Sequence, residues 1–347
     1  MWQREAHDGV TSTAAIADGR VYVAELSGNV RCLDLRSGEE FWHYRTIENE
    51  DPEEFAPGFN APVTLSDTAV FVGDEEGKFY ALDRESGKLL WPPFGTDGEI
   101  KGGATILPPD DTGVERVMFG SHDGKLYCLN AATGEKVWEF DTLGPVNGSQ
   151  ALARSRNADG SESLFTFVAG CDKPFLRVVN VADGQQHSEI HLESLMVASP
   201  SLIGNVLYFG TPDGEVIALD WTTQQQLWLY ADKQRTQEIH SSPATTDTLV
   251  IIGSRDKRLH AVDRATGQVV WTFETRGQVD SSPVLVGERI FFGSADRHIY
   301  AVDLSGKEVW KHNTGRRISA SPAVGDGHLV IGCEGPAGPI LCFGAKE

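Results

Sequence analysis

The 347-residue sequence has few basic residues and no long hydrophobic segment. Its 30 Lys and Arg against 50 Asp and Glu give a formal charge of −20, which argues against a nucleic-acid partner and against a polybasic membrane-binding surface. No run of about 18 apolar residues is present, so we expect no direct insertion into a membrane. The first residues do not form a signal peptide, so an exported protein and a cytoplasmic one both stay open.

Cysteine is also scarce, and its spacing is typical of neither a disulfide framework nor a metal site. The five cysteines include no Cys-x-x-Cys motif and no adjacent pair. Cys32, Cys128 and Cys342 fall in a half-buried strand position, where we expect them to act as small apolar core residues. Cys171 and Cys333 follow a glycine at the end of a strand, where we expect greater exposure.

Glycine is abundant, with 37 residues, and it marks the turns of a repeated unit. In each copy a β-branched and aromatic run ends in Gly, and a polar turn leads to an apolar run that ends in Asp or Asn. A second Gly and then a Trp follow. Successive Trp positions are 39 to 49 residues apart. They are occupied by Trp42, Trp91, Trp138, Trp228, Trp271 and Trp310, with His187 in the fourth copy.

Each copy predicts four short antiparallel strands, the unit of a β-propeller blade. Seven copies are complete, and an eighth covers residues 319–343 but lacks its Trp strand. Trp2 supplies the missing residue, so residues 1–6 should complete that last blade and close the ring. The sequence therefore predicts one all-β domain over residues 1–347, an eight-bladed propeller whose N-terminal strand belongs to the final blade.

The repeat resembles the pyrroloquinoline-quinone-type (PQQ-like) repeat, whose signature is Ala-x-Asp-x-x-Thr-Gly-x-x-x-Trp. Residues 261–271 match it fully, and the resemblance covers essentially the whole chain. One branch of this family is the quinoprotein alcohol dehydrogenases. The other contains non-enzymatic propellers similar to the lipoprotein of the outer-membrane β-barrel assembly machinery, which use the repeat as an interaction platform. The resemblance implies a periplasmic or cell-envelope protein of bacteria.

The dehydrogenase branch requires a quinone held between flat surfaces, an adjacent Cys-Cys pair as one of them, and a calcium ion bound by oxygen ligands. This sequence has no adjacent cysteines. The inner ring, read three residues before the Pro position of each innermost strand, offers one carboxylate, one amide and a lysine. We interpret Lys101, Asn147, His240 and Asp280 as the wall of a hydrated channel, with a small polar site at the channel mouth as the alternative. The ring positions are Thr11, Phe59, Lys101, Asn147, Val197, His240, Asp280 and Ser319.

Charge is unevenly distributed over one face of the predicted ring, the face that carries the second turn of each blade and the links between blades. Its early loops are acidic and its late loops are basic, a separation that steers and orients a partner. Trp221 is the one Trp in a turn, where we expect exposure at an interface. The acidic residues are Glu48, Glu50, Asp51, Glu53, Glu54, Asp74, Glu75 and Glu76. The basic residues are Lys233, Arg235, Arg255, Lys257, Arg258, Arg276, Arg297, Arg316 and Arg317.

These features favour a non-catalytic propeller that acts as a monomeric binding module for proteins, without cofactor or metal. Its predicted partner is a protein or an acidic, polyanionic ligand on the loop face of blades five to eight. A dehydrogenase that uses pyrroloquinoline quinone and calcium is the first alternative. An envelope protein that binds carbohydrate or another polyanion is the second.

Overall fold

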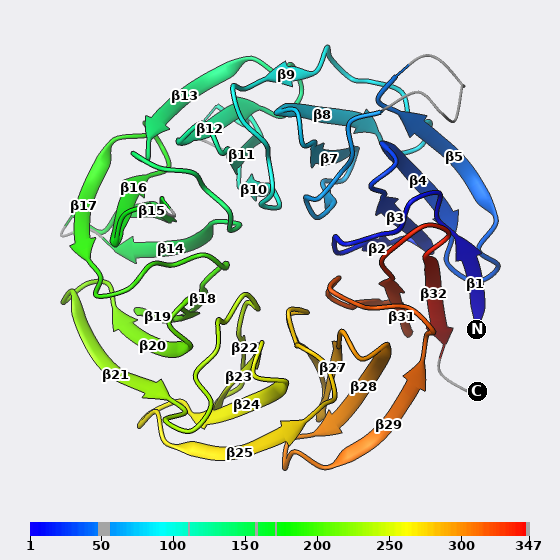
Figure 1. The fold of residues 1–347 in the computed structure, drawn as a ribbon. Coiled ribbons are helices and arrows are strands. Elements are labelled where there is room, and N and C mark those ends of the chain that lie inside the picture. The colour runs from blue at the N-terminus through cyan, green and yellow to red at the C-terminus, as the bar shows by residue number, and fades with distance from the viewer. Residues whose placement is uncertain (48–55, 110–111, 157–158, 171, 345–347) are drawn as a thin grey trace.

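The computed structural model describes residues 1–47, 56–109, 112–156, 159–170 and 172–344. Within these ranges the chain forms eight four-stranded antiparallel sheets arranged around a central axis, as Figure 1 shows. The prediction of an eight-bladed β-propeller is confirmed. The described residues contain no helix with the length and hydrophobicity that a membrane crossing requires.

Blades 1 to 7 place their strands in chain order from the central axis to the rim. Blade 1 consists of β2 (Ala15–Ala17), β3 (Arg20–Ala24), β4 (Asn29–Asp34) and β5 (Glu40–Arg45), and blade 2 of β6 (Thr64–Leu65), β7 (Ala69–Gly73), β8 (Lys78–Asp83) and β9 (Phe94–Gly95). Blade 3 consists of β10 (Thr105–Leu107), β11 (Arg116–Gly120), β12 (Lys125–Asn130) and β13 (Lys136–Asp141), and blade 4 of β14 (Ala151–Arg156), β15 (Glu162–Ala169), β16 (Phe175–Asn180) and β17 (Gln186–His191).

The second half of the ring repeats this arrangement, and its last blade borrows a strand from the N-terminus. Blade 5 consists of β18 (Ser201–Ile203), β19 (Val206–Gly210), β20 (Glu215–Asp220) and β21 (Gln225–Ala231), and blade 6 of β22 (Ala244–Thr245), β23 (Leu249–Ser254), β24 (Arg258–Asp263) and β25 (Val269–Glu274). Blade 7 consists of β26 (Val284–Val286), β27 (Arg289–Gly293), β28 (His298–Asp303) and β29 (Glu308–Asn313), and blade 8 of β30 (Ala323–Gly325), β31 (His328–Gly332), β32 (Pro339–Gly344) and β1 (Trp2–Glu5).

The ring closes through the pairing of β1 with β32. Trp2 lies opposite Cys342 and Arg4 opposite Ile340 in an antiparallel ladder, and Figure 1 shows β1 and β32 side by side. The predicted closure by the N-terminal strand is therefore confirmed. It gives β32 a partner on its outer side, so the last blade has the same number of strands as the others.

The core lies between neighbouring blades, because each sheet is apolar on both faces of its two central strands. Between blades 1 and 2, for example, Tyr22 and Val30 of one sheet share a buried cluster with Val70 and Tyr80 of the next. The same kind of cluster joins blade 8 to blade 1 and buries Val330. No blade can bury its apolar faces alone, which couples the stability of each to its neighbours.

Six junctions between blades share one device near the rim, a Trp packed on a Gly of the following blade. Each Gly has a φ of +70 to +82°, and a Cβ added there would lie 2.5 to 2.7 Å from the indole ring. Each indole N–H also donates to a carbonyl of that blade at 2.8 to 3.1 Å. The Trp–Gly pairs are Trp2–Gly38, Trp42–Gly87, Trp91–Gly134, Trp138–Gly184, Trp228–Gly267 and Trp271–Gly306.

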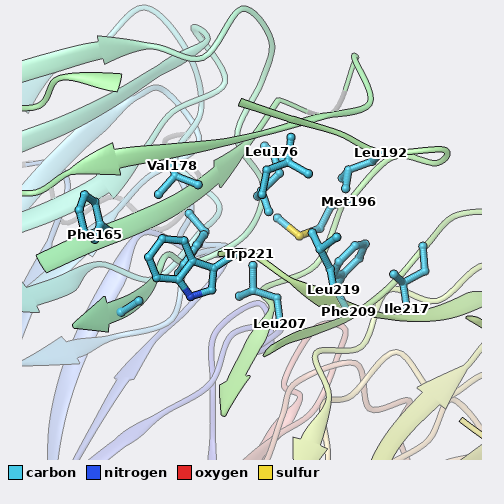
Figure 2. Close-up of a cluster of buried hydrophobic side chains, with 14 residues drawn as sticks. Phe165, Leu176, Val178, Leu192, Met196, Leu207, Phe209, Ile217, Leu219 and Trp221 are labelled. Atoms are coloured by element: carbon cyan, nitrogen blue, oxygen red, sulfur yellow. The ribbon is translucent and has the colours of Figure 1, made fainter. Parts of the chain in front are cut away.

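The junction between blades 4 and 5 replaces all parts of this device. His187 stands at the Trp position, Gln224 stands at the Gly position with a φ of +59°, and Trp221 enters the gap from blade 5. Trp221 is only 5% exposed and packs on Phe165 and Phe167, with ring centroids 5.6 and 5.4 Å away (Figure 2). The expectation that Trp221 is exposed is wrong, because its turn faces a space that no other indole fills.

All four cysteines that the structure describes are buried, although greater exposure was expected for one of them. Cys32, Cys128 and Cys342 are buried, as expected for apolar core residues, and burial raises the pKa of the Cys32 thiol to about 11. Cys333 is fully buried as well, so the expectation of greater exposure is wrong there. Its side chain belongs to the cluster between blades 7 and 8. Cys171 lies outside the described residues.

Candidate functional site

One mouth of the central channel forms a polar cavity of about 190 Å³. Its lining comes from the short segments that lead into the innermost strands of blades 1 to 6 and blade 8. Lys101, Asn147 and His240 line this cavity, so three of the four predicted channel residues are gathered there. Thr11 and Val197 of the predicted ring lie beside them. Asp280 stands outside the lining and is held by an arginine instead.

Phe59 does not belong to the ring, contrary to its predicted position. It is fully buried in the cluster between blades 1 and 2, and Asn60 lines the cavity in its place. The ring position of blade 2 is one residue later than predicted because its proline stands one residue early. Pro62 lies next to Gly103, at the level that serines occupy in other blades. A buried apolar residue before each ring position, such as Ile100, could have revealed the shift.

A row of serine hydroxyls ties the inner segments of neighbouring blades together. The backbone N–H of Gly103 donates to Ser149 Oγ at 2.9 Å, and the N–H of Ser149 donates to Ser199 Oγ at 2.8 Å. Across the channel, Ser242 N–H donates to Ser282 Oγ and Ser282 N–H donates to Ser321 Oγ, both at 2.9 Å. The hydroxyls thus act as structural acceptors that hold the blades in register around the axis.

The charged groups at the mouth are paired with one another on both sides of the channel. On blades 2 and 3, Lys101 Nζ lies 3.2 Å from Glu99 Oε2, and Asn60 Nδ2 donates to Glu99 Oε1 at 3.0 Å. His122 Nε2 is hydrogen-bonded to Asn147 Oδ1. Lys101 and Asn60 therefore both bind Glu99, and Asn147 is bound by His122.

The opposite side of the mouth is organised by Arg255. Its guanidinium lies 2.7 Å from Glu238 and 2.9 Å from Asp280, and His240 Nε2 lies 2.9 Å from the same glutamate. The hydrogen bond to His240, together with the charge of Arg255, lowers the pKa of Glu238. The hydrogen bond to Asp280 raises the pKa of Arg255. Both carboxylates are thus neutralised by cations of the chain itself.

This donor set does not fit the calcium ion of a quinoprotein dehydrogenase. Calcium takes six to eight oxygen ligands, several of them carboxylates. Here Glu99 and Asp280 belong to separate clusters, and each is already paired with a lysine or an arginine. In the described ranges no group of three or more His, Cys, Asp and Glu residues is arranged to hold a metal.

On the loop face, several of the predicted basic residues are engaged within the chain. Besides Arg255, Arg258 lies 2.8 Å from Asp232 and 3.3 Å from Glu274 with a largely buried side chain. A backbone hydrogen bond from Gln234 and the charge of Arg258 lower the pKa of Asp232. Looser pairs join Arg235 to Glu274 at 3.5 Å and Arg317 to Glu334 at 3.8 Å. Arg255 and Arg258 therefore stabilise loops and are not free for a partner.

Four other cations on this face are exposed and form no ion pair with any described residue. They follow one another around blades 6 to 8, because the links between blades bind the preceding turns: Thr275 N–H donates to Lys257 O at 2.8 Å and Thr314 N–H donates to Arg297 O at 2.9 Å. We call these four the basic arc. It consists of Lys257, Arg276, Arg297 and Arg316. Lys233 is also exposed and unpaired within the described ranges, but it lies apart on blade 5.

Two residues of the basic arc have a backbone conformation that favours glycine. Lys257 and Arg297 both have a φ of +73°. The same turn position in blades 1, 2, 3 and 5 is glycine, namely Gly28, Gly77, Gly124 and Gly214. A side chain in this conformation costs roughly 1 kcal/mol. The chain thus accepts strain at two successive turns where the result is an exposed cation.

The acidic half of the predicted charge separation is only partly present. Asp74 is fully buried, where it accepts hydrogen bonds from Tyr80 and from the N–H groups of Glu76 and Lys78, so it is a structural residue and not a surface charge. Glu75 Oε1 accepts from Gly58 N–H at 3.0 Å. Glu76 is exposed and lies 3.9 Å from Lys78 Nζ. The other five acidic residues of this prediction lie outside the described residues: Glu48, Glu50, Asp51, Glu53 and Glu54.

Comparison with known families separates the two branches that the repeat resembles. The family model described as "Outer membrane protein assembly factor BamB" matches residues 26–93 and 232–338, just over half of the chain. The chain belongs to this family. A second model, described as "Glucose/ethanol/alcohol dehydrogenase, beta-propeller domain", matches residues 175–282. The predicted membership in the PQQ-like propellers of the BamB type is therefore confirmed.

Individual relatives also differ in how much of this chain they cover. The BamB assembly factor of Shewanella oneidensis is 22% identical over 289 residues, covering 78% of this chain and 69% of the relative. The quinoprotein ethanol dehydrogenase of Pseudomonas aeruginosa is 26% identical over 144 residues, covering 39% of this chain and 23% of that enzyme. The solved structure of BamB from Moraxella catarrhalis has a TM-score of 0.75 at 18% identity and covers 100% of this chain and 97% of its own, which supports the fold. The sequence relatives favour the scaffold prediction over the dehydrogenase.

Proposed function

We propose that the protein is a non-catalytic propeller scaffold of the bacterial cell envelope that takes part in the assembly of outer-membrane proteins. Membership in the BamB family supports this proposal, and so does the extent of the alignments to proteins named as assembly factors. The partner site that we propose is the basic arc on blades 6 to 8, and the partner is an acidic segment of another protein.

The observation that carries the partner site is the exposure of four successive cations, none of them in an ion pair with a residue that the structure describes, in a chain of net charge −20. Exposed charges form few stable pairs on their own, but several of one sign along a line orient and accelerate the approach of a complementary partner. The strained φ angles of Lys257 and Arg297 support a functional role, because glycine would satisfy the turn without strain.

The channel mouth supports a structural role more than a catalytic one. Its carboxylates are held by Lys101 and Arg255, and its serine hydroxyls accept hydrogen bonds from neighbouring blades. A general base must be free to reach the proton that it abstracts. We therefore propose no reaction and no cofactor for this cavity.

Affinity capture from an envelope extract of the source organism tests the proposal. The wild-type chain should retain a component of the outer-membrane assembly apparatus, identified by mass spectrometry. The triple variant Arg276→Glu, Arg297→Glu and Arg316→Glu should retain at least about tenfold less, because each reversal replaces an attraction by a repulsion.

A matched variant separates a specific surface from net charge. Arg36→Glu, Lys88→Glu and Lys307→Glu reverse three exposed cations on the turns of the opposite face, and this variant should capture normally. Equal loss in both variants, or undiminished capture by the arc variant, would reject the basic arc. Retention of pyrroloquinoline quinone with Ca²⁺ during gel filtration would instead favour the dehydrogenase, and selective binding to an acidic glycan array would favour the polyanion binder.

A further inference from the structure

The outermost strand of each blade has a free edge, and such edges are usually protected against pairing with other chains. Six of these strands carry at least one charged side chain: β1, β5, β13, β17, β25 and β29. β9 has only two residues and is preceded by Pro92 and Pro93. β21 is the exception, because its seven residues include no charge and no proline.

β21 is also the longest outermost strand. Its register with β20 extends to Asp220 opposite Gln225. In blades 3 and 6 the equivalent residues are joined by one backbone hydrogen bond, from Asn130 N–H to Glu135 O at 2.9 Å and from Asp263 N–H to Gln268 O at 2.7 Å. The turn that leads into β21 holds Gln224 where those two blades have Gly134 and Gly267. β21 thus follows directly on the irregular turn at the junction between blades 4 and 5.

The side chains of β21 divide between two directions. Trp228 packs on blade 6, where its indole N–H donates to Arg264 O at 3.0 Å, and Tyr230 is hydrogen-bonded to His260 in the same blade. Leu227 and Leu229 alternate with them and are 52% and 38% exposed. Only β20 pairs with β21 in the described part of the chain, and Figure 1 shows β21 on the rim with no strand outside it. The strand thus presents backbone groups at its edge beside an apolar flank.

We propose that the free edge of β21 binds an extended segment of another protein by strand addition. The segment carries no charge over about seven residues and has apolar side chains at every second position, so that they meet Leu227 and Leu229. The absence of charge on β21 determines this choice, because a charged side chain placed against Gln225–Ala231 would lose water and find no counter-ion on the strand itself.

A second copy of this chain fits the edge less well. Two convex rims that meet edge to edge contact each other along one strand, about seven residues a side. A stable interface needs about 20 to 30 residues a side. An extended segment has no such convex body and can follow the strand over its whole length.

Alternating apolar residues without charge are typical of strands that cross an outer membrane. The identity of the partner, a membrane strand during assembly, rests on the proposed function. The docking mode itself rests on β21 alone. Backbone pairing would supply affinity with little dependence on sequence, as suits a scaffold that handles several partners.

The test uses the full chain and a fluorescent synthetic peptide of about ten residues that alternates valine and threonine. Fluorescence anisotropy measures binding, and hydrogen exchange locates it. The peptide should bind and slow the exchange of amides in β21 more than in any other outermost strand. A peptide of the same composition with proline at alternate positions should not bind, because it cannot form the ladder.

Variants assign the effect to the apolar flank. Leu227→Lys and Leu229→Lys together should weaken binding at least tenfold by adding the charges that protect other edges. Val137→Lys, on the already charged strand β13, changes a side chain that is 47% exposed and should leave binding unaltered. Circular dichroism of all variants checks the fold.

Protection of another blade, equal binding by the lysine variants, or dimerisation through β21 without peptide would each overturn the proposal. Failure here would leave the capture test of the basic arc intact, since the two surfaces share no residue.

Discussion

The six regular junctions and the two irregular ones differ in a way that explains the repeat. At the regular junctions a Trp and a positive-φ Gly meet face to face, so neither can change alone. Between blades 4 and 5 both are replaced, and Trp221 fills the volume from the opposite side. Trp and Gly are therefore two halves of one contact between blades and not separate marks of each blade.

The second irregular junction joins blade 7 to blade 8. Trp310 is 36% exposed, and its indole N–H has no acceptor in the described part of the chain. The reason is topological, because β32 and β1 come from opposite ends of the chain and no turn joins them to offer a Gly or a carbonyl. Trp310 packs instead on Phe343, at 5.2 Å between ring centroids.

Removal of the indole should show the largest contrast. Trp138→Ala should lower the free energy of unfolding by about 3–5 kcal/mol, because a buried ring and its hydrogen bond to Val181 are both lost. Trp310→Ala should cost roughly 1–2 kcal/mol, because part of its surface is already in water. Urea unfolding followed by tryptophan fluorescence measures both, and equal costs would contradict a weak junction between blades 7 and 8.

A Cβ at the Gly position should give the next largest effect. Gly87→Ala places a carbon 2.5 Å from the Trp42 ring at a φ of +70°, which should cost about 2–4 kcal/mol. Gln224→Ala is the matched control, because that position already holds a side chain, and it should stay within about 0.5 kcal/mol. Thermal midpoints of the two variants compare them directly; a tolerated alanine at 87 would mean that the indole moves aside.

We expect that the Trp–Gly contact can be restored between blades 4 and 5 only if His187, Trp221 and Gln224 are all replaced. His187→Trp alone should destabilise by about 1–3 kcal/mol, because two indoles would compete for one volume. Trp221→Val and Gln224→Gly added to it should recover most of that loss. A mutant cycle on thermal midpoints measures the coupling, and strictly additive effects would show that these positions do not share the junction.

The smallest effect concerns the turns that begin with Asp or Asn. Hydrogen bonds from Ser86 lower the pKa of Asp83, so this turn stabilises the fold above the ordinary pKa of 3.8 and loses that stabilisation as the pH falls through the lower folded value. Asn130 binds its turn without titrating. Asp83→Asn should flatten the acid limb of the thermal midpoint, and Asn130→Asp should steepen it. An unchanged acid limb in both variants would show that the charge of the turn residue does not contribute to the pH dependence of stability.

The fold could be predicted in detail because the same pattern of strand and turn residues recurs in eight copies along the chain. Trp spacing and the split eighth copy together indicated β1 beside β32. The site was harder to predict. The shifted Pro62 misplaced Phe59 by one residue, and in a strand a shift of one residue exchanges core and channel. Arg255 and Arg258 belonged to a basic run in sequence, but their pairing depends on Asp280 and Asp232 in distant loops.

Periodicity by itself determined the number of blades, their strand order and the closure, because those follow from local hydrophobic pattern and turn chemistry. Only the tertiary structure decided which cations stay free, which Trp is buried and which strand edge is unprotected. Each of these depends on the groups that a neighbouring blade brings within a few ångströms. Such contacts join segments that are remote in the chain, and the local sequence pattern does not specify them.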